Sequence, residues 1–160
     1  MRKKTIEEYV EIIYEIQKKK KKVHTNDVAS ALNINPSSVT EMFYKLTDEG
    51  YIFYEKYNGV KLTDKGKSIA IMLKKRHETL RHFLELLGVD KEIANNDACR
   101  IEHNVNPQTV KKLRKFIEYA KRENACSRWL DHFKYFDETG KFIICSPKKE
   151  FNCPIHKNDK

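Results

Sequence analysis

Apolar residues recur every three or four positions along most of the chain, which is the period of an amphipathic helix. The first such run predicts a helix over 5–21, with Thr5 as its N-cap and Glu8 completing a capping box. Five consecutive lysines, Lys18 to Lys22, end this run and are typical of a solvated helix terminus. The chain is therefore expected to open on a helix with a strongly basic end.

Two shorter apolar stripes follow, separated by a break over 33–36. The first begins at Thr25, and the second takes Pro36 as its first helical residue. A helix, a tight turn and a second helix make a helix-turn-helix arrangement. Over 51–63 the period changes to that of strands around an Asn-Gly turn, which predicts a small β-hairpin wing. Residues 1–65 are therefore predicted to form a winged helix-turn-helix domain that binds DNA.

A long apolar stripe after the wing predicts a helix of about 65–87 that Gly88 ends. Shorter helices are expected near 90–104 and 107–123. Because no strand pattern interrupts these helices, residues 66–123 are predicted to form an all-helical second domain. The fold class is mainly α, with the wing as the only strand pair.

The tail, residues 124–160, is predicted to be less regular, with a turn at Thr139-Gly140 and a short strand over 142–145. It contains three of the four cysteines and a Cys-x2-His pair, whose spacing fits half of a zinc site. A Zn²⁺ site, an iron–sulfur site and free thiols are the three interpretations. The candidate ligands of this second metal site are Cys126, Cys145, Cys153 and His156.

Composition narrows the class of protein. The 160 residues are 39% hydrophobic with only 5 Gly and 4 Pro, which suits small globular domains and excludes collagen-like or low-complexity chains. No apolar run approaches the ~20 residues that span a bilayer, so a soluble, cytoplasmic protein with no membrane partner is expected. The net charge of +9 favours polyanionic partners, yet residues 1–65 hold 12 basic against 10 acidic residues. A DNA contact in the first domain therefore needs a local patch.

The start of the second short helix carries residues suited to DNA. Ser37, Ser38 and Thr40 lie in the turns of a recognition helix that meet base edges, and small hydroxyl side chains allow close approach. Ser and Thr are also common at helix starts for structural reasons, so these residues alone do not indicate DNA binding. The DNA-binding interpretation depends on the neighbouring helix and on the hairpin that follows. Lys61 and the wing tip, which is the hairpin turn formed by Lys56, Tyr57 and Asn58, become candidate contacts to DNA phosphates or to the minor groove. The predicted DNA-binding residues are Thr25, Asn35, Pro36, Ser37, Ser38, Thr40, Lys56, Tyr57 and Asn58.

A second candidate site begins with Cys99, Glu102 and His103, which share one face if their segment is helical. Thiolate, carboxylate and imidazole form a mixed ligand set that suits Fe²⁺, Mn²⁺, Co²⁺, Ni²⁺ or Zn²⁺ more than Mg²⁺ or Ca²⁺. The structural alternative is a solvated Glu-His pair beside a packed cysteine. Residues elsewhere in the chain that could add ligands are Glu8, Glu11 and His77.

Five segments of the chain carry a family likeness in their order and spacing: Glu7–Tyr14, Asn35–Thr40, Leu62–Gly66, Arg76-His77 and Ala98–His103. Together they resemble the diphtheria-toxin-repressor family of metal-dependent transcriptional repressors, which includes the manganese transport regulators. The resemblance covers about 1–123. It implies a homodimer with an N-terminal winged helix, a helical dimerisation domain and a metal site. It also implies that Fe²⁺ or Mn²⁺ switches on binding to a palindromic double-stranded DNA operator upstream of metal-uptake genes.

The resemblance also implies a ligand set: Glu8, Glu11, His77, Cys99, Glu102 and His103. Iron-type members have cysteine at the position of Cys99, where manganese regulators have glutamate, and a soft thiolate favours Fe²⁺. The ancillary site of iron-type members would need glutamate and histidine where this chain has Arg81 and Asn95. A winged-helix regulator with altered or lost metal sensing is therefore one alternative. A metalloenzyme is the other, and no enzymatic activity is expected because no catalytic motif accompanies the ligands.

Overall fold

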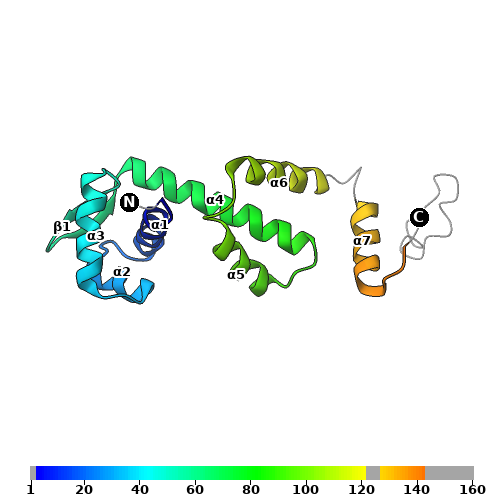
Figure 1. The fold of residues 1–160 in the computed structure, drawn as a ribbon, viewed down its shortest axis with the longest axis horizontal. Helices are drawn as coiled ribbons and strands as arrows, with labels where there is room; N and C mark the ends of the chain where they lie inside the picture. The colour runs from blue at the N-terminus through cyan, green and yellow to red at the C-terminus, as the bar shows by residue number, and fades with distance from the viewer. Residues whose placement is uncertain (1–2, 122–126, 143–160) are drawn as a thin grey trace. The chain divides into compact units, whose positions relative to one another are not determined.

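The structure, a computed structural model, describes residues 3–121 and 127–142 (Figure 1). By compactness the chain divides into two units, Met1–Glu78 with Cys99–Asn104, and Thr79–Ala98 with Val105–Lys160. The domain limits at 65 and 123 stay a prediction. The helices and strands, in chain order, are α1 (Lys3–Lys19), α2 (Thr25–Leu32), α3 (Pro36–Asp48), β1 (Ile52–Glu55), β2 (Gly59–Leu62), α4 (Asp64–Leu86), α5 (Lys91–Ile101), α6 (Pro107–Ala120) and α7 (Ser127–Thr139).

The predicted winged helix-turn-helix is confirmed in the first unit. α2 ends at Asn33, which takes the left-handed conformation with φ of 54°, and α3 begins at Pro36. Asparagine tolerates this backbone conformation better than most residues, which suits the tight turn between the helices. α1 begins at Lys3, so the predicted N-cap Thr5 is wrong: it lies inside the helix, because lysines before it are compatible with helical structure.

The wing is a two-stranded antiparallel sheet in which Ile52 pairs with Leu62 and Phe53 with Lys61. Alternation points Ile52, Val60 and Leu62 into the core. That core also contains side chains from the three helices before the wing, and all its fully buried members come from residues 9–70: Tyr9, Val10, Ile13, Val23, Val28, Ala29, Val39, Phe43, Leu46, Ile52, Val60, Leu62 and Ala70.

α4 begins where the wing ends. The Thr63 hydroxyl oxygen accepts a hydrogen bond from the Gly66 backbone N–H at 3.1 Å and lies 2.8 Å from the Gly50 carbonyl, to which it donates. This cap joins the start of α4 to the chain just before β1. Gly66 itself is buried against the Tyr51 carbonyl, where a Cβ would lie 2.2 Å from the oxygen. The close approach of backbone to backbone therefore requires glycine.

Substitution Gly66→Ala is expected to lower the free energy of unfolding by about 1–3 kcal/mol, because the added methyl group overlaps a backbone oxygen that cannot move aside freely. Alanine's higher helix propensity acts in the opposite direction but is worth only about 1 kcal/mol. Urea denaturation monitored by circular dichroism measures the change. Ser68→Ala, on the exposed face of the same helix, is the control and should change stability little.

The second unit is helical, as predicted, within the residues that the structure describes. Gly88, with φ of 91°, follows the end of α4. Phe116 of α6 contacts Phe83 of α4 and Trp129 of α7, with ring centroids 6.0 and 5.7 Å apart. None of the described helices is both long and apolar enough to cross a bilayer.

Two predictions for this half are corrected. The irregular tail is wrong over Ser127–Thr139, which form α7, because Trp129, Phe133 and Phe136 recur with the helical period rather than forming an irregular aromatic stretch. The helix near 90–104 is shorter, since α5 ends at Ile101. The strand over 142–145 falls, beyond its first residue, outside the described residues. The candidate tail ligands also lie outside them: Cys126, Cys145, Cys153 and His156.

Candidate metal centre and nucleic-acid surface

Three of the predicted metal ligands come together in the first unit. One ligand atom each from Glu11, Glu102 and His103 lies within 4.8 Å of the others. Glu11 comes from α1, whereas Glu102 and His103 lie in the turn that follows α5. Because α5 ends before Glu102, these residues do not share a helix face with Cys99, and tertiary packing rather than helical spacing brings the three together. Residues 91 positions apart in the sequence thus meet in one small volume.

Glu7 fixes the orientation of the His103 ring. The Nδ1 atom of His103 lies 3.0 Å from Glu7 Oε2, and both side chains are almost completely buried. An ionised carboxylate can only accept, so Nδ1 carries the proton and donates it. In the neutral ring Nε2 then has a lone pair, which points toward Glu102 Oε1 at 3.6 Å and Glu11 Oε2 at 3.9 Å. Three acceptor atoms therefore face one another.

Glu102 is the buried acid of this group, with 0% of its surface exposed. Its backbone carbonyl accepts a hydrogen bond from Arg76 Nη1 at 2.8 Å, which ties the turn after α5 to α4. Its Oε2 lies 3.1 Å from His77 Nδ1, whereas Oε1 has no hydrogen-bond partner among the described residues. A buried carboxylate oxygen without a donor is costly, so this position suits a bound cation.

The charges in the group act on its neighbours. Burial, and then the negative charge of Glu102, raise the pKa of Glu11, although the two nearby imidazoles lower it in part. Partial desolvation raises the pKa of the Cys99 thiol, and the charges of Glu102 and Glu11 raise it further. In both groups burial is the larger cause of the raised pKa, and the neighbouring carboxylates add to it.

The structure places the other predicted ligands around this group rather than in it. His77 contacts Glu102, as described above, while Glu8 on α1 is half-buried and Cys99 is exposed at the end of α5. None of these three contributes an atom to the group within 4.8 Å among the described residues. Their part in binding an ion stays a prediction. At the position implied for an ancillary ligand, Arg81 pairs with Glu85 instead.

The donor set fits a divalent transition metal. Two carboxylates and one imidazole are ligands that Mn²⁺, Fe²⁺ and Zn²⁺ accept, and a cation among the three facing atoms would satisfy the buried oxygen of Glu102. Glu7 would serve this site as a positioning residue, because metal-bound histidines commonly donate their second N–H to a carboxylate. The chemistry of these residues therefore fits a divalent-cation site.

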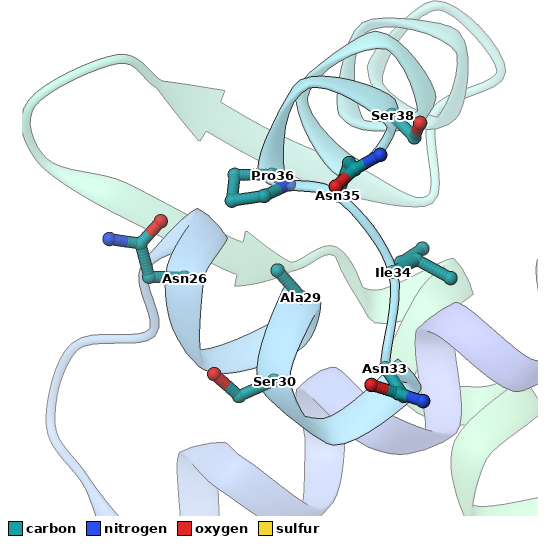
Figure 2. A pocket seen from close by; sticks show the side chains of 8 residues that line it. All are labelled: Asn26, Ala29, Ser30, Asn33, Ile34, Asn35, Pro36 and Ser38. Atoms are coloured by element: carbon teal, nitrogen blue, oxygen red, sulfur yellow. The ribbon is translucent and has the colours of Figure 1, made fainter.

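The predicted DNA-binding residues gather at the helix-turn-helix and the wing. Figure 2 shows an open hollow between α2 and the start of α3, with Asn35, Pro36 and Ser38 along it. Ser37 is also exposed, while Thr40 is partly buried and its hydroxyl donates to the Pro36 carbonyl at 3.0 Å. Thr25 opens α2. The wing tip is exposed at all three predicted residues: Tyr57 is 85% accessible, and Lys56 and Asn58 beside it are exposed as well.

Comparison with known proteins now defines the family. Residues 1–60 match the family described as iron dependent repressor, N-terminal DNA binding domain. Residues 63–129 match iron dependent repressor, metal binding and dimerisation domain. The chain belongs to the iron-dependent repressor family. The diphtheria-toxin-repressor resemblance is thereby confirmed, and this is a family of transcriptional regulators rather than enzymes.

The chain is 40% identical over 121 residues to the HTH-type transcriptional regulator MntR of Bacillus subtilis (strain 168), a match covering 76% of this chain and 85% of that protein. Two solved structures are also similar. The manganese-dependent transcriptional repressor in complex with manganese matches with a TM-score of 0.65 and 25% identity over 73% of this chain. The metal-dependent transcriptional regulator MtsR matches with a TM-score of 0.64 and 29% identity over 71%. In both cases the match covers 54% of the other chain, so this repressor spans about half the length of those structures.

Two residues of the centre were not predicted from the sequence of this repressor. Glu7 lies one helical turn before Glu11, and that i, i+4 spacing could have placed both on one face of α1. Arg76 had no such signal, because a buried arginine that holds a distant carbonyl is recognised only once the chain has folded.

Proposed function

We propose that this repressor is activated by Fe²⁺ or Mn²⁺, binds palindromic operators as a homodimer and controls metal-uptake genes. One observation supports the metal dependence above all: ligand atoms of Glu11, Glu102 and His103 converge within 4.8 Å in the unit that contains the helix-turn-helix. The names of the manganese-responsive relatives and the two matched family domains agree with this proposal.

The residues suggest how metal binding and DNA binding are coupled. Glu11 projects from α1, whose Val10 and Ile13 are fully buried in the core of the winged helix. Glu102 and His103 lie in the Cys99–Asn104 segment, whose neighbours on both sides along the chain belong to the second unit. When bound, the cation supplies the positive charge that lets the carboxylates stay close. α1 and this segment are then held together, which restricts the winged helix relative to the chain that carries the dimerisation domain.

Restricting the winged helix affects DNA binding through the distance between the two recognition helices of the dimer. Two recognition helices of a dimer enter successive major grooves only when they lie about 34 Å apart, or a multiple of it. Narrowing the range of separations toward this value favours the operator-bound state by roughly 1–3 kcal/mol per linked site. Without the ion, burial of Glu11 and the negative charge of Glu102, which both raise the pKa of Glu11, oppose the same arrangement.

The ligand chemistry favours Mn²⁺ over Fe²⁺. The converging atoms are two carboxylate oxygens and one imidazole nitrogen, which suit a harder cation. The soft thiolate that would favour Fe²⁺ belongs to Cys99, whose sulfur is not among the atoms that converge within 4.8 Å. A Cys99→Ser variant that keeps its order of preference between the two metals would support this assignment.

Anaerobic titration with Mn²⁺, Fe²⁺ and Zn²⁺ tests the proposed function, followed by a gel shift on DNA from upstream of the gene for this protein. We expect Mn²⁺ or Fe²⁺ to strengthen binding to a palindromic site at least about fivefold, the low end of typical coupling energies. Equal operator affinity with and without metal would contradict metal activation. Binding to a single half-site, with no gain from a second inverted half-site, would contradict the proposal that the protein binds its operator as a homodimer.

Substitution Glu7→Gln is expected to lower metal affinity by about 10–100-fold, because the amide can still accept from His103 Nδ1 but no longer increases the basicity of the ring through its charge. Isothermal titration with Mn²⁺ measures the effect. Glu15→Gln removes an exposed carboxylate from the same helix and should leave affinity unchanged. An unaltered affinity in Glu7→Gln would show that this carboxylate does not tune the centre.

A further inference from the structure

The lysine run does not end as a free helix terminus, because its last residues join the wing. Val23 forms an antiparallel bridge with Val60, whose N–H donates to the Val23 carbonyl at 2.8 Å. Both valines are fully buried. Antiparallel pairing then places Lys22 opposite Lys61 and His24 opposite Gly59. The segment is therefore fixed in register as a third strand-like chain beside β2.

The packing at Gly59 confirms this register. A Cβ on Gly59 would lie 2.4 Å from the Val23 carbonyl oxygen and 3.5 Å from Nδ1 of His24. Only a glycine lets the two backbones approach so closely, and its φ of 90° is one that other residues rarely adopt. The position of Lys22 beside the wing is thus determined by tight backbone packing.

Lys22 and Lys61 form a pair of like charges directly opposite each other. Lys22 precedes the buried Val23, and Lys61 follows the buried Val60. Because successive side chains along a strand point to opposite faces, both lysines lie on the outer face, and both are exposed. Like charges at opposed positions destabilise a sheet. Among the described residues neither lysine forms an ion pair, whereas Lys20, two residues before Lys22, pairs with Asp27 at 2.5 Å. The pair therefore lacks the anion that would make it favourable.

The surroundings of the pair suit an extended polyanion. Lys22 and Lys61 line one shallow hollow together with Phe53, Glu55, Asn58 and Gly59. The one acid there, Glu55, is bonded to Asn58 Nδ2 at 2.6 Å. Along the chain Lys22 is followed by Val23, His24 and then α2, whose Asn26 lines the hollow of the helix-turn-helix (Figure 2). Asn58, one of the predicted DNA-binding residues of the wing, lines the same hollow as the basic pair.

We propose that Lys22 and Lys61 together bind a phosphate of the DNA backbone and give this protein affinity for double-stranded DNA without metal, a role that presupposes the proposed DNA-binding function. Two ammonium groups on adjacent chains neutralise phosphate charge without reading sequence. Neither lysine contacts the group formed by Glu11, Glu102 and His103, so the contribution is the same in the metal-free and metal-loaded protein.

The test compares two variants that each lose two positive charges. Lys22→Gln/Lys61→Gln removes the pair, and Lys111→Gln/Lys112→Gln removes two exposed lysines from α6. Binding to a short duplex without an operator is measured by fluorescence anisotropy in EDTA, between about 50 and 200 mM salt. For the first variant we expect affinity at the lowest salt to fall about tenfold or more. The slope of log K against log salt should become shallower by roughly 1–2 per bound subunit. The control should keep its slope.

A charge reversal separates a DNA role from a structural one. Lys61→Glu places a carboxylate opposite Lys22 and removes the same net charge as the double glutamine variant. The thermal unfolding midpoint should therefore stay the same or rise, while duplex affinity falls to about that of the double glutamine variant. An unchanged slope in Lys22→Gln/Lys61→Gln, an equal loss in the α6 control, or no duplex binding by the unmodified protein in EDTA would each overturn the proposal.

The proposed function is tested separately by adding Mn²⁺ and operator DNA to the same proteins. Metal activation should persist in Lys22→Gln/Lys61→Gln, with the ratio of affinities with and without metal close to that of the unmodified protein. If Mn²⁺ does not strengthen operator binding by the unmodified protein, the proposed function is contradicted. The comparison of the two double variants in EDTA would still decide whether Lys22 and Lys61 bind DNA.

Discussion

Glu102→Gln is expected to make the metal-free protein more stable and to abolish its stabilisation by metal. Glu102 is completely buried, and its Oε1 has no hydrogen-bond partner among the described residues, with His103 Nε2 lying 3.6 Å away. The neutral amide removes a buried charge and offers an N–H toward His103 Nε2 or Glu11 Oε2. We expect a gain of about 1–3 kcal/mol in the metal-free state, the size of a buried polar group relieved of its desolvation penalty.

The same substitution removes a ligand. Metal affinity should fall by more than about 100-fold, since even a residue that only orients a ligand commonly contributes 10–100-fold. Urea denaturation with and without Mn²⁺ measures both effects, because a ligand that binds only the folded state raises the apparent stability. If Glu102 is a metal ligand, the variant should be more stable than the unmodified protein without Mn²⁺ and less stable than it with Mn²⁺. If Glu102 is only a buried acid, the substitution should change stability in the same direction in both conditions.

Glu15→Gln is the matched control for this experiment. It makes the same chemical change on α1, but Glu15 is exposed and paired with Lys18 at the surface. Its denaturation curves should differ little from those of the unmodified protein, and Mn²⁺ should stabilise it normally. A Glu102→Gln protein that is less stable without metal, or that Mn²⁺ still stabilises, would exclude Glu102 as the buried ligand.

Ser38→Glu is expected to weaken operator binding by at least about 100-fold while leaving metal binding intact. Ser38 is exposed in the first turn of α3 and lines the hollow between the two helices of the helix-turn-helix (Figure 2). A carboxylate there would approach phosphates and the acceptor-rich edges of bases. Loss of one base contact costs roughly 1–3 kcal/mol, and like-charge repulsion adds to it. Gel shifts with saturating Mn²⁺ measure the change.

Metal binding should not change, because no atom of the converging ligand group comes from α3. Ser68→Glu adds the same charge on the exposed side of α4 and should retain most of the operator affinity. If both variants bind operator equally well, the start of α3 does not contact DNA. If Ser38→Glu also loses Mn²⁺, its effect comes from misfolding rather than from the DNA surface.

The winged helix could be predicted from the sequence because its signals are local. Pro36 fixes a helix start, and the change from helical to alternating period marks the wing. The metal centre could be predicted only in part. Its residue types were evident, but the assumption of a shared helix face failed because α5 ends at Ile101, and the converging set depends on contacts between Glu11 and residues far along the chain.

The lysine run shows the same limit of local inference. A charge run at a helix end is usually solvated, and nothing local indicates that Val23 will pair with Val60. The bridge between Val23 and Val60 places Lys22 opposite Lys61, rather than leaving it as an isolated charge after the helix. Likewise the contact between Glu7 and His103 could not be predicted, because which face of α1 meets the turn after α5 is decided only by packing.

The buried cluster of the winged helix draws all its members from residues 9–70, whereas two of the three converging ligand residues lie beyond residue 100. The hydrophobic core of the winged helix is therefore complete without the segment that carries Glu102 and His103. A chain truncated after the winged helix would keep the residues of this core but lack two of the three converging ligand residues. A substitution in that later segment is accordingly expected to impair the candidate metal centre while sparing the fold of the winged helix.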